Sequence, residues 1–566
     1  MRQALPVTAG RAHMRKKCHP ILLTAVFAVS TWSLLVFVGT LVHAGEVPLG
    51  HSDFVPSPER PVGWRGDGTG CFPGANPPPG FTTNDIRWRT HLPSYGYSSP
   101  LVVKDRVFVA CDPDRLLCLS ASDGKILWER RATLGAIVGG DLETQKRLDR
   151  KIEIIHRLSI LNGIGMKDDA NVLAERQKLE RQLGEVDPEL ADLTQREAEQ
   201  KQKKGAPPIL AENLYRTLGI RMGLDWWTWI DSAFPTPTSD GIGVYAVFAY
   251  GQVVCYDLEG NRIWATLHRL LPEPKRGGRP NANQMSTVPS PLLIQGILVV
   301  QQGSALRGYR ASDGQTLWEI PYNSFSSCDD GYYRCGTPVS MRLGDITVIV
   351  TARGWVIRLA DGRVLANDES RQCTTMNDPI PLPSHNIFVS VAYNRGRGMS
   401  AWSLTLDGDR LNVKELWHNT DKRGNEPMLW FGNRLFGIRR DLIEINYLTG
   451  QESRLGDGPA GHPYRDVLVG GSLLFVQRQY SGEWPGVVRI GDKPTAIGKW
   501  TLPKTRPRLE WFDETFPQWS APLSADKKTP KPSLPDFTSQ SLFFFHGEKI
   551  FARTVGEVMC IQRKTP

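Results

Sequence analysis

Most local signatures of catalysis are missing from this sequence of 566 residues. It contains no His-Glu-x-x-His, no Cys/His cluster with the spacing of a zinc site, no Gly-x-Ser-x-Gly and no phosphate-binding P-loop. The Gly-rich run at residues 66–70 follows no expected strand, so it does not predict a phosphate site. Hydrophobic residues make up 40% and charged residues 22% of the chain, which excludes a disordered protein and a multi-span membrane protein.

A basic surface of the kind that binds nucleic acid is also missing. The formal net charge is +9, but residues 1–44 contain five basic side chains and no acidic one, which leaves +4 for the rest of the chain. Binding to nucleic acid requires positive charge clustered on the folded part of a protein. We therefore expect no nucleic-acid partner.

Only one long apolar run occurs, at residues 21–42. It follows a short basic run, an order that is typical of an export signal. Small residues at Val42 and Ala44 favour cleavage before Gly45, whereas the length of the run also suits an uncleaved anchor. Residues 1–44 are thus predicted to be a signal peptide or a signal anchor, with membrane contact through 21–42 if it stays uncleaved. The basic residues before the run predict an extracytoplasmic body, in the periplasm or elsewhere in the cell envelope.

What the sequence does contain is Gly, Pro and Trp, at 54, 41 and 17 residues, which indicates many short strands and tight turns. Several segments repeat an Asp-Gly or Glu-Gly turn that is followed, in most copies, by a strand with Trp. The clearest copies are Ala121-Ser-Asp-Gly-Lys-Ile-Leu-Trp128, Asp257-Leu-Glu-Gly-Asn-Arg-Ile-Trp264, Ala311-Ser-Asp-Gly-Gln-Thr-Leu-Trp318 and the Trp-less Leu359-Ala-Asp-Gly-Arg-Val-Leu365. Trp417 follows a looser copy, and Trp88 lies in an isolated strand before the first repeat. We expect Trp88, Trp128, Trp264, Trp318 and Trp417 to pack between neighbouring repeats.

Each repeat is expected to form four short antiparallel strands, with the Gly turn supplying the positive φ that a tight hairpin needs. Units of this size bury their faces by stacking around an axis, which predicts an all-β fold, a β-propeller over residues 85–566. Eight repeats are counted, and seven blades are the alternative because the sixth and seventh repeats are degenerate. The last repeat lacks a Trp strand, so strand 85–91 is expected to complete the last blade and close the ring. Residues 45–84 are expected to form an extended N-terminal segment.

One insertion, residues 133–235, interrupts the ring between the first two blades. Apolar residues at helical spacing in 141–161 and a helix-favouring charged stretch at 168–203 predict a helical hairpin. A partner-binding arm and a solvated decoration packed on one blade are the two interpretations of this hairpin. The Trp-rich cluster at 226–229 either binds a partner or carbohydrate or packs against the second blade.

Three of the Cys residues, Cys118, Cys255 and Cys560, occupy one slot of the third strand, which Gly308 fills in the third repeat. A crowded inner strand explains small residues there, so we expect free buried thiols rather than redox or metal groups.

A fourth and a fifth Cys residue, Cys328 and Cys335, flank a short loop. In an oxidising compartment such a pair favours a local disulfide, with metal ligation or two unrelated thiols as alternatives.

The repeat resembles that of the pyrroloquinoline-quinone-like (PQQ-like) propeller family, whose mark is Ala-x-Asp-x-x-Thr-Gly-x-x-x-Trp or its Asp-Gly variant. The opening Arg60-Pro-Val-Gly-Trp-Arg-Gly-Asp-Gly-Thr-Gly70 also looks like that of exported bacterial proteins with these repeats. The resemblance implies one of two functions. Quinoprotein dehydrogenases of this superfamily hold PQQ and Ca²⁺ at the central funnel, whereas the assembly lipoprotein of the outer-membrane β-barrel machinery uses its propeller for protein contacts without a cofactor.

The motifs that mark the dehydrogenases are absent, because the sequence contains neither a Cys-Cys pair nor Cys-x-x-Cys-His. Glu129, Asn323, Asp329 and Asp378 have the chemistry of Ca²⁺ ligands, but no spacing singles them out, so no catalytic, cofactor or metal residue is assigned. We expect a binding or scaffold module of the cell envelope, with a protein or glycan partner and no cofactor. A PQQ- and Ca²⁺-dependent alcohol or sugar dehydrogenase is the alternative.

Overall fold

The computed structural model describes parts of the chain between residues 60 and 563. The gaps in this range are 61–62, 73, 95, 97, 164–168, 189–234, 249, 269–288, 303–304, 322–335, 369–377, 393–397, 421–426, 439–440, 458–463, 479–482, 492–494, 502–509, 518–541 and 555. The predicted export segment, the Trp cluster at 226–229 and the Cys328–Cys335 pair lie outside the described residues. No helix among the described residues is long and apolar enough to cross a membrane.

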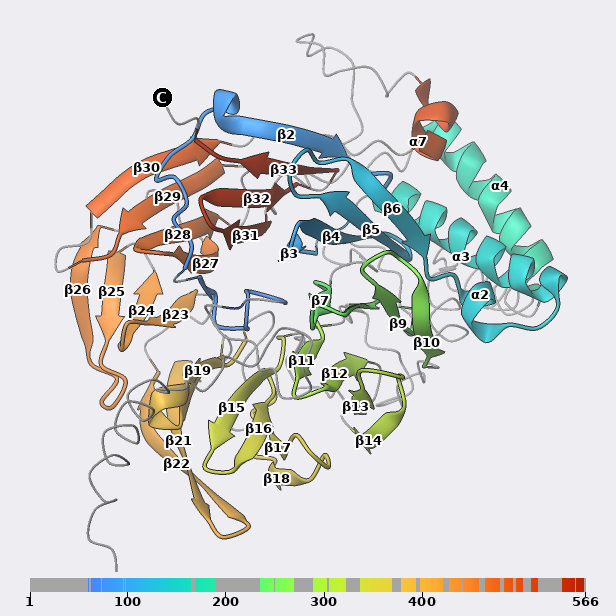
Figure 1. The fold of residues 1–566 in the computed structure, drawn as a ribbon. Helices are drawn as coiled ribbons and strands as arrows, with labels where there is room; N and C mark the ends of the chain where they lie inside the picture. The colour runs from blue at the N-terminus through green and yellow to red at the C-terminus, as the bar shows by residue number, and fades with distance from the viewer. Residues whose placement is uncertain are drawn as a thin grey trace, which may run out of the picture. The chain divides into compact units, whose positions relative to one another are not determined.

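The described strands form eight sheets, which confirms the eight-bladed propeller (Figure 1). Blade 1 comprises β3 (Leu101–Val103), β4 (Arg106–Cys111), β5 (Arg115–Ser120) and β6 (Ile126–Arg131). Blade 2 comprises β7 (Thr238–Ser239), β8 (Gly243–Val247), β9 (Gln252–Asp257) and β10 (Arg262–Leu267). Blade 3 comprises β11 (Leu292–Ile294), β12 (Ile297–Gln302), β13 (Ala305–Arg310) and β14 (Thr316–Pro321). Blade 4 comprises β15 (Val339–Leu343), β16 (Ile346–Val350), β17 (Val356–Arg358) and β18 (Val364–Ala366).

The other four blades follow in chain order and complete the ring (Figure 1). Blade 5 comprises β19 (Ile380–Leu382), β20 (Ile387–Ala392), β21 (Gly398–Asp407) and β22 (Arg410–Asn419). Blade 6 comprises β23 (Met428–Phe431), β24 (Arg434–Ile438), β25 (Asp441–Ile445) and β26 (Glu452–Asp457). Blade 7 comprises β27 (Tyr464–Gly470), β28 (Leu473–Arg478), β29 (Glu483–Arg489), β30 (Thr495–Thr501) and, as a fifth strand, β1 (Cys71–Phe72). Blade 8 comprises β31 (Leu542–His546), β32 (Lys549–Arg553), β33 (Glu557–Ile561) and β2 (Ile86–His91).

The ring is closed by strands from the two ends of its sequence. Strand β2 pairs antiparallel with β33, with Trp88 opposite Cys560 and Thr90 opposite Val558. The Arg89 side chain donates to the Glu557 carboxylate, which is only 2% exposed. The outer strand of blade 8 therefore comes from the N-terminal side of the propeller and joins the ring without a covalent link.

The repeated Trp of one blade contacts the Gly turn of the next blade and so joins the two. The indole N–H of Trp128 donates to the Leu258 carbonyl of the next blade at 2.8 Å. The indole also covers Gly260 of the Glu-Gly turn, where an added Cβ would lie 2.8 Å from the ring. The same two contacts recur at four other seams, in the pairs Trp88–Gly124, Trp264–Gly314, Trp318–Gly362 and Trp417–Gly450. We call this contact the indole lock; its Gly combines a positive φ with a close approach to the indole, and only Gly tolerates both.

A small residue faces each Trp within its own blade. Cys118, Cys255 and Cys560 lie opposite Trp128, Trp264 and Trp88, and Gly308 lies opposite Trp318. An added Cβ at Gly308 would lie 2.2 Å from the Trp318 indole, so a large side chain has no room in this slot. The three Cys side chains are buried and unoxidised. Burial raises the pKa of Cys118 to about 12 and that of Cys560 to about 11.

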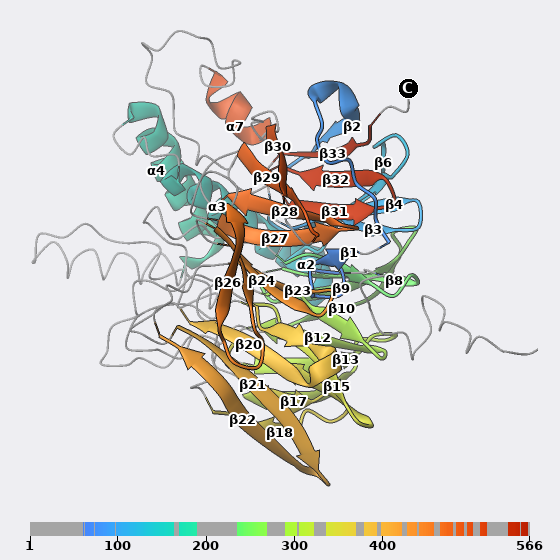
Figure 2. The ribbon, with the colours of Figure 1, turned by 90° about the vertical axis from the view of Figure 1, so that its left-hand side faces the viewer.

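The two faces of the ring differ in their connections. Because the strands of a blade are antiparallel, the turns after the first and third strands share one face, which we call the turn face. The turns after the second strands and the blade-to-blade connections share the other, the loop face. Figure 2 shows the ring edge-on. The helices lie in the connections on the loop face. They are α2 (Leu134–Val138), α3 (Leu142–Gly163) and α4 (Ala170–Val186) between blades 1 and 2, and α7 (Glu510–Thr515) between blades 7 and 8.

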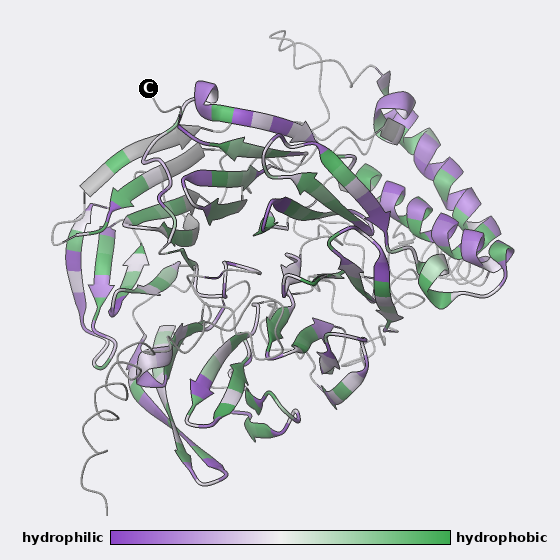
Figure 3. Ribbon diagram, viewed as in Figure 1, coloured by the Kyte–Doolittle hydropathy of each residue, from purple (hydrophilic) through white to green (hydrophobic). Residues whose placement is uncertain are grey.

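The helical insertion is packed rather than isolated in solvent. Helix α3 buries Ile152, Ile154, Ile155 and Leu158, and helix α4 buries Leu179. Hydrophilic residues predominate on the outer sides of these two helices, while hydrophobic residues gather in the strands of the blades (Figure 3). The hairpin expected between the first two blades is thus present over α3 and α4.

Candidate functional site

The N-terminal part of the described chain lies along the ring axis. Residues 63–77, which we call the axial segment, lie inside the ring (Figure 1) and begin at the loop face. There the Trp64 indole N–H donates to Asp378 Oδ2 at 2.6 Å, just before the inner strand of blade 5. Next, Arg65 Nη2 donates to the Val467 carbonyl of β27 at 3.2 Å. The axial segment is thus bound at the inner edge of blade 5 and to the inner strand of blade 7.

The middle of the axial segment adds a strand to blade 7. Strand β1 pairs parallel with β27, with Cys71 opposite Val469 and Phe72 opposite Gly470. Phe72 is 1% exposed and places its ring edge-on to Phe544 and Phe545 of blade 8, at centroid distances of 5.1 and 5.3 Å. Parallel pairing so near the axis buries both faces of this short strand.

The segment leaves the axis on the turn face. The backbone N–H of Asn76 donates to the Gly547 carbonyl at 2.7 Å, in the turn between β31 and β32. From there the chain continues through a 3-10 turn at Thr83–Asp85 into β2 on the outside of blade 8. The axial segment therefore runs through the ring from the loop face to the turn face. The expected extended N-terminal segment, residues 45–84, is described from residue 60 onward, and most of that part follows this path.

A series of short polar residues lies at the entries of blades 1 to 5. Each of the first five blades is entered through a short polar residue followed by Pro, at Ser99, Thr236, Ser290, Thr337 and Asp378. The backbone N–H of Ser99 donates to Thr236 Oγ1 at 2.9 Å, that of Thr236 to Ser290 Oγ at 2.9 Å, and that of Thr337 to Asp378 Oδ1 at 2.6 Å. In these three bonds the backbone of one blade donates to the side chain of the next. They link the inner strands of adjacent blades as the indole locks link the outer ones.

Asp378 differs from the hydroxyl residues of this series for a structural reason. Its two carboxylate oxygens accept from Thr337 N–H and from the Trp64 indole N–H, at 2.6 Å each. A charged acceptor with two oxygens holds two donors at once and forms stronger hydrogen bonds than a neutral hydroxyl. The sequence signal for this site is the Asp-Pro dipeptide at the position where other repeats carry Ser-Pro or Thr-Pro, and motif analysis alone does not identify it.

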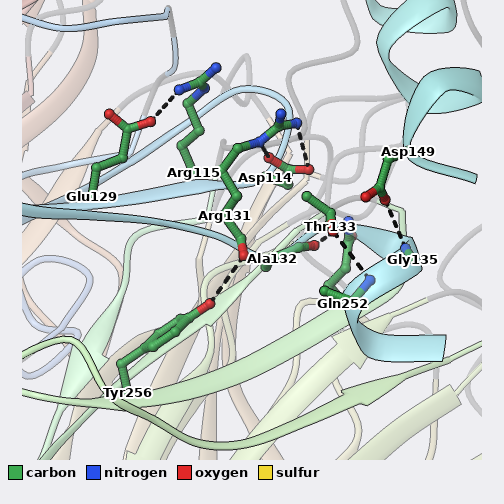
Figure 4. Close-up of polar contacts among 11 residues, drawn as sticks. Asp114, Arg115, Glu129, Arg131, Ala132, Thr133, Gly135, Asp149, Gln252 and Tyr256 are labelled. Carbon is green, nitrogen blue, oxygen red and sulfur yellow. Dashed lines mark hydrogen bonds and ion pairs between the residues drawn. The ribbon is translucent and has the colours of Figure 1, made fainter. Parts of the chain in front are cut away.

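The four residues with Ca²⁺-ligand chemistry do not form one site in the described chain. Asn323 and Asp329 lie outside the described residues. Glu129 is on the outer strand β6, where it pairs with Arg115 (Figure 4). Asp378 is engaged at the inner edge of blade 5. Within the described ranges, no three His, Cys, Asp or Glu side chains are grouped so that they could hold a metal ion. Of the four residues, the two that are described, Glu129 and Asp378, are thus each engaged in other contacts.

A second set of polar residues joins blade 1 to blade 2 and to the helical insertion (Figure 4). Arg131 donates two hydrogen bonds to the Asp114 carboxylate, at 2.8 and 3.1 Å, and Asp114 is 1% exposed. Gln252 of blade 2 donates to the Ala132 carbonyl at 3.2 Å. Asp149 of α3 accepts the backbone N–H of Gly135 at 2.8 Å. These contacts hold the base of the insertion in place and leave its outer surface for other contacts.

Helix α3 also carries a His, with its side chain 12% exposed, on this side of the ring. His156 Nδ1 lies 4.0 Å from Asp112 Oδ2 of blade 1. Burial lowers the pKa of His156, although Asp112 opposes this effect. The neutral ring is the form expected at this junction near neutral pH. Arg157, next to it, places its guanidinium 5.1 Å from the centre of the Trp511 ring in α7, so both helical insertions meet on the loop face.

Comparison with known proteins points to one family. The sequence model of the family described as outer membrane protein assembly factor BamB matches residues 81–147 and 223–405. No curated protein matches the sequence.

Several solved structures are similar to this chain at low sequence identity. BamB from Moraxella catarrhalis is 13% identical, with 59% of this chain and 85% of that chain covered and a TM-score of 0.34. Quinohemoprotein alcohol dehydrogenase from Comamonas testosteroni is 8% identical, with 92% and 85% covered and a TM-score of 0.42. The computationally designed Ika8 protein is 10% identical, with 84% and 99% covered and a TM-score of 0.44.

Proposed function

Because the chain belongs to the PQQ-like β-propeller family, we propose that it acts in the cell envelope as a non-catalytic scaffold that binds a protein partner. The observation that carries this proposal is the axial segment. It lies along the ring axis, where the dehydrogenases of the superfamily hold their cofactor, and it uses both oxygens of Asp378. The description of the matching family as an assembly factor supports a protein as the partner.

The geometry suits a scaffold because the ring holds its loops in fixed relative positions. Indole locks join the outer strands of five seams, and backbone-to-side-chain hydrogen bonds join inner strands. The loop face carries both helical insertions, so it presents a larger and more varied surface than the turn face. Binding residues are commonly placed on loops that a rigid framework positions. We therefore place the partner contact on the loop face, on or beside α4.

A cofactor test separates the scaffold from the dehydrogenase. The purified protein is mixed with PQQ and Ca²⁺, and its thermal midpoint and dye-linked oxidation of alcohols and sugars are measured. A cofactor at a hundredfold excess over its dissociation constant would add about 2.7 kcal/mol to the stability of the folded state. We expect no rise in the midpoint and no dye reduction. A rise in the midpoint together with substrate-dependent dye reduction would overturn the scaffold proposal.

A cross-linking test addresses the partner and its side of the ring. A photo-reactive amino acid replaces Leu173 on α4, which is 40% exposed, or Asp409 on the turn face, whose side chain is 83% exposed. After irradiation of intact cells, we expect one discrete adduct with another envelope protein from position 173 and none from position 409. The absence of a discrete adduct at 173, or equal adducts at both positions, contradicts a partner site on the loop face.

A further inference from the structure

Three seams of the ring have no indole lock among the described residues. Strand β18 of blade 4 contains no Trp, and Gly408 in the corresponding turn of blade 5 has no atom within 4 Å of an added Cβ. Strand β26 of blade 6 also contains no Trp, and Gly491 in the next blade likewise faces open space. Blade 8 has no covalent turn between its third and fourth strands, so the seam between blades 7 and 8 offers no Gly turn to cover.

The seam between blades 4 and 5 is covered by a local extension. Strands β21 and β22 each have ten residues and continue as a hairpin beyond Ile387, the first residue of β20. Leu404 of this hairpin is 2% exposed and packs in one cluster with Met341 and Leu343 of blade 4. This seam therefore has its own replacement for the lock.

The seam between blades 6 and 7 is covered by the axial segment. Cys71 packs in one cluster with Leu429 of blade 6 and with Val467 of blade 7. Its Sγ–H donates to the Trp430 carbonyl at 3.2 Å, while its strand pairs with β27. A single residue thus contacts both sides of a seam that lacks an indole.

The seam between blades 7 and 8 is covered by the next residues of the same segment. Phe72 hydrogen-bonds through its carbonyl to the Gly471 N–H at 3.0 Å in blade 7 and packs its ring on Phe544 and Phe545 in blade 8. Pro77 lies so close to Gly470 that an added Cβ there would be 2.6 Å from the Pro ring. Asn76 is hydrogen-bonded to the turn of blade 8.

We propose that the axial segment is a clamp that replaces the missing indole locks between blades 6, 7 and 8, and that its release opens the ring at these two seams. The contacts that support this proposal lie at the two seams without a lock, near the inner strands, and on both sides of each seam. The three seams among blades 1 to 4 each have a Trp, so we expect these seams to stay closed when the segment is released. Since the chain continues from the segment through the turn at Thr83–Asp85 into β2, one N-terminal stretch closes blade 8 and contacts the seams beside it. This inference is independent of the proposed scaffold function.

Hydrogen–deuterium exchange of two matched variants of the full chain tests the clamp. Phe72→Ala removes the ring that bridges blades 7 and 8, and Phe108→Ala removes an equally buried ring from blade 1, at 1% and 0% exposure. Backbone amides exchange through local opening, so loss of a buried aromatic contact speeds exchange where that contact holds the structure. We expect Phe72→Ala to speed exchange of β27, β28, β31 and β32 roughly 100-fold, with β11–β14 of blade 3 unchanged. Phe108→Ala should leave β27 and β28 unchanged.

A milder variant keeps the test valid if Phe72→Ala does not fold. Asp378→Ser restores the hydroxyl of the other blades, so Thr337 keeps an acceptor while Trp64 loses its own. We expect faster exchange in 63–72 and in β27, again with blade 3 unchanged. Faster exchange spread evenly over all blades, or no change in blades 6 to 8 with either variant, would overturn the clamp.

Discussion

The indole lock predicts that two similar Gly→Ala substitutions lower the free energy of unfolding by different amounts. Gly314 and Gly408 both lie in turns between the third and fourth strands of a blade and both have positive φ, +73° and +56°. At Gly314 an added Cβ would lie 2.6 Å from the Trp264 indole, whereas at Gly408 no atom lies within 4 Å. The comparison of Gly314→Ala with Gly408→Ala therefore isolates the lock from the backbone strain.

The expected magnitudes follow from these two contributions. An Ala in the left-handed region costs about 1–2 kcal/mol at either position. Overpacking against a buried indole adds about 1–3 kcal/mol at Gly314 alone. Trp264 cannot move away freely, because its N–H donates to the Ala311 carbonyl at 2.8 Å and its ring lies 6.1 Å from that of Tyr245. We expect Gly314→Ala to lower the free energy of unfolding by about 2–5 kcal/mol and Gly408→Ala by about 1–2 kcal/mol.

Urea unfolding followed by Trp fluorescence measures both variants in the same way. The native spectrum adds an independent observation, because displacement of Trp264 from its buried position should shift the emission of Gly314→Ala to longer wavelength. Gly408→Ala should keep the native spectrum of the parent protein. Equal losses of stability in the two variants, with unchanged spectra, would refute the claim that the indole makes Gly necessary in these turns.

Two further predictions follow from the pKa shifts of buried groups. Burial raises the pKa of Cys118 to about 12 and of Cys560 to about 11. At pH 8, maleimide should therefore label these two Cys side chains only after the protein is denatured. Labelling of the native protein would contradict the packing of these side chains beside Trp128 and Trp88. Burial, assisted by Arg307, lowers the pKa of His268 from 6.5 to about 4. The unfolded chain therefore binds this proton more readily, and the contribution of His268 to stability is lost as the pH falls from about 6.5 to about 4. His268→Gln keeps an acceptor for the Tyr309 hydroxyl without titrating, so its urea midpoint should fall less over this window, and an unchanged pH dependence would contradict the assignment.

Much of the fold could be predicted from the sequence because its determinants are local and repeated. The Asp-Gly turn and the Trp that follows it are within eight residues of each other, and each repeat states the same geometry again. The small size of the residue opposite each Trp could also be predicted from the sequence. Cys118, Cys255 and Gly308 occupy this position, and each faces a Trp in its own blade. Eight blades, their order and the helical insertion follow from such short patterns.

The site depended on contacts that short patterns do not contain. Trp64 and Asp378 are 314 residues apart in the sequence, and nothing near either residue indicates the other. The path of the axial segment, its contacts with blades 6 to 8 and the use of both Asp378 oxygens follow only from the tertiary structure, in which the ring surrounds the segment. The physical reason is the range of the contacts. The residues of one repeat determine its own strands and their packing on the adjacent blade, whereas the axial segment is held by contacts with several blades that are far apart in the sequence.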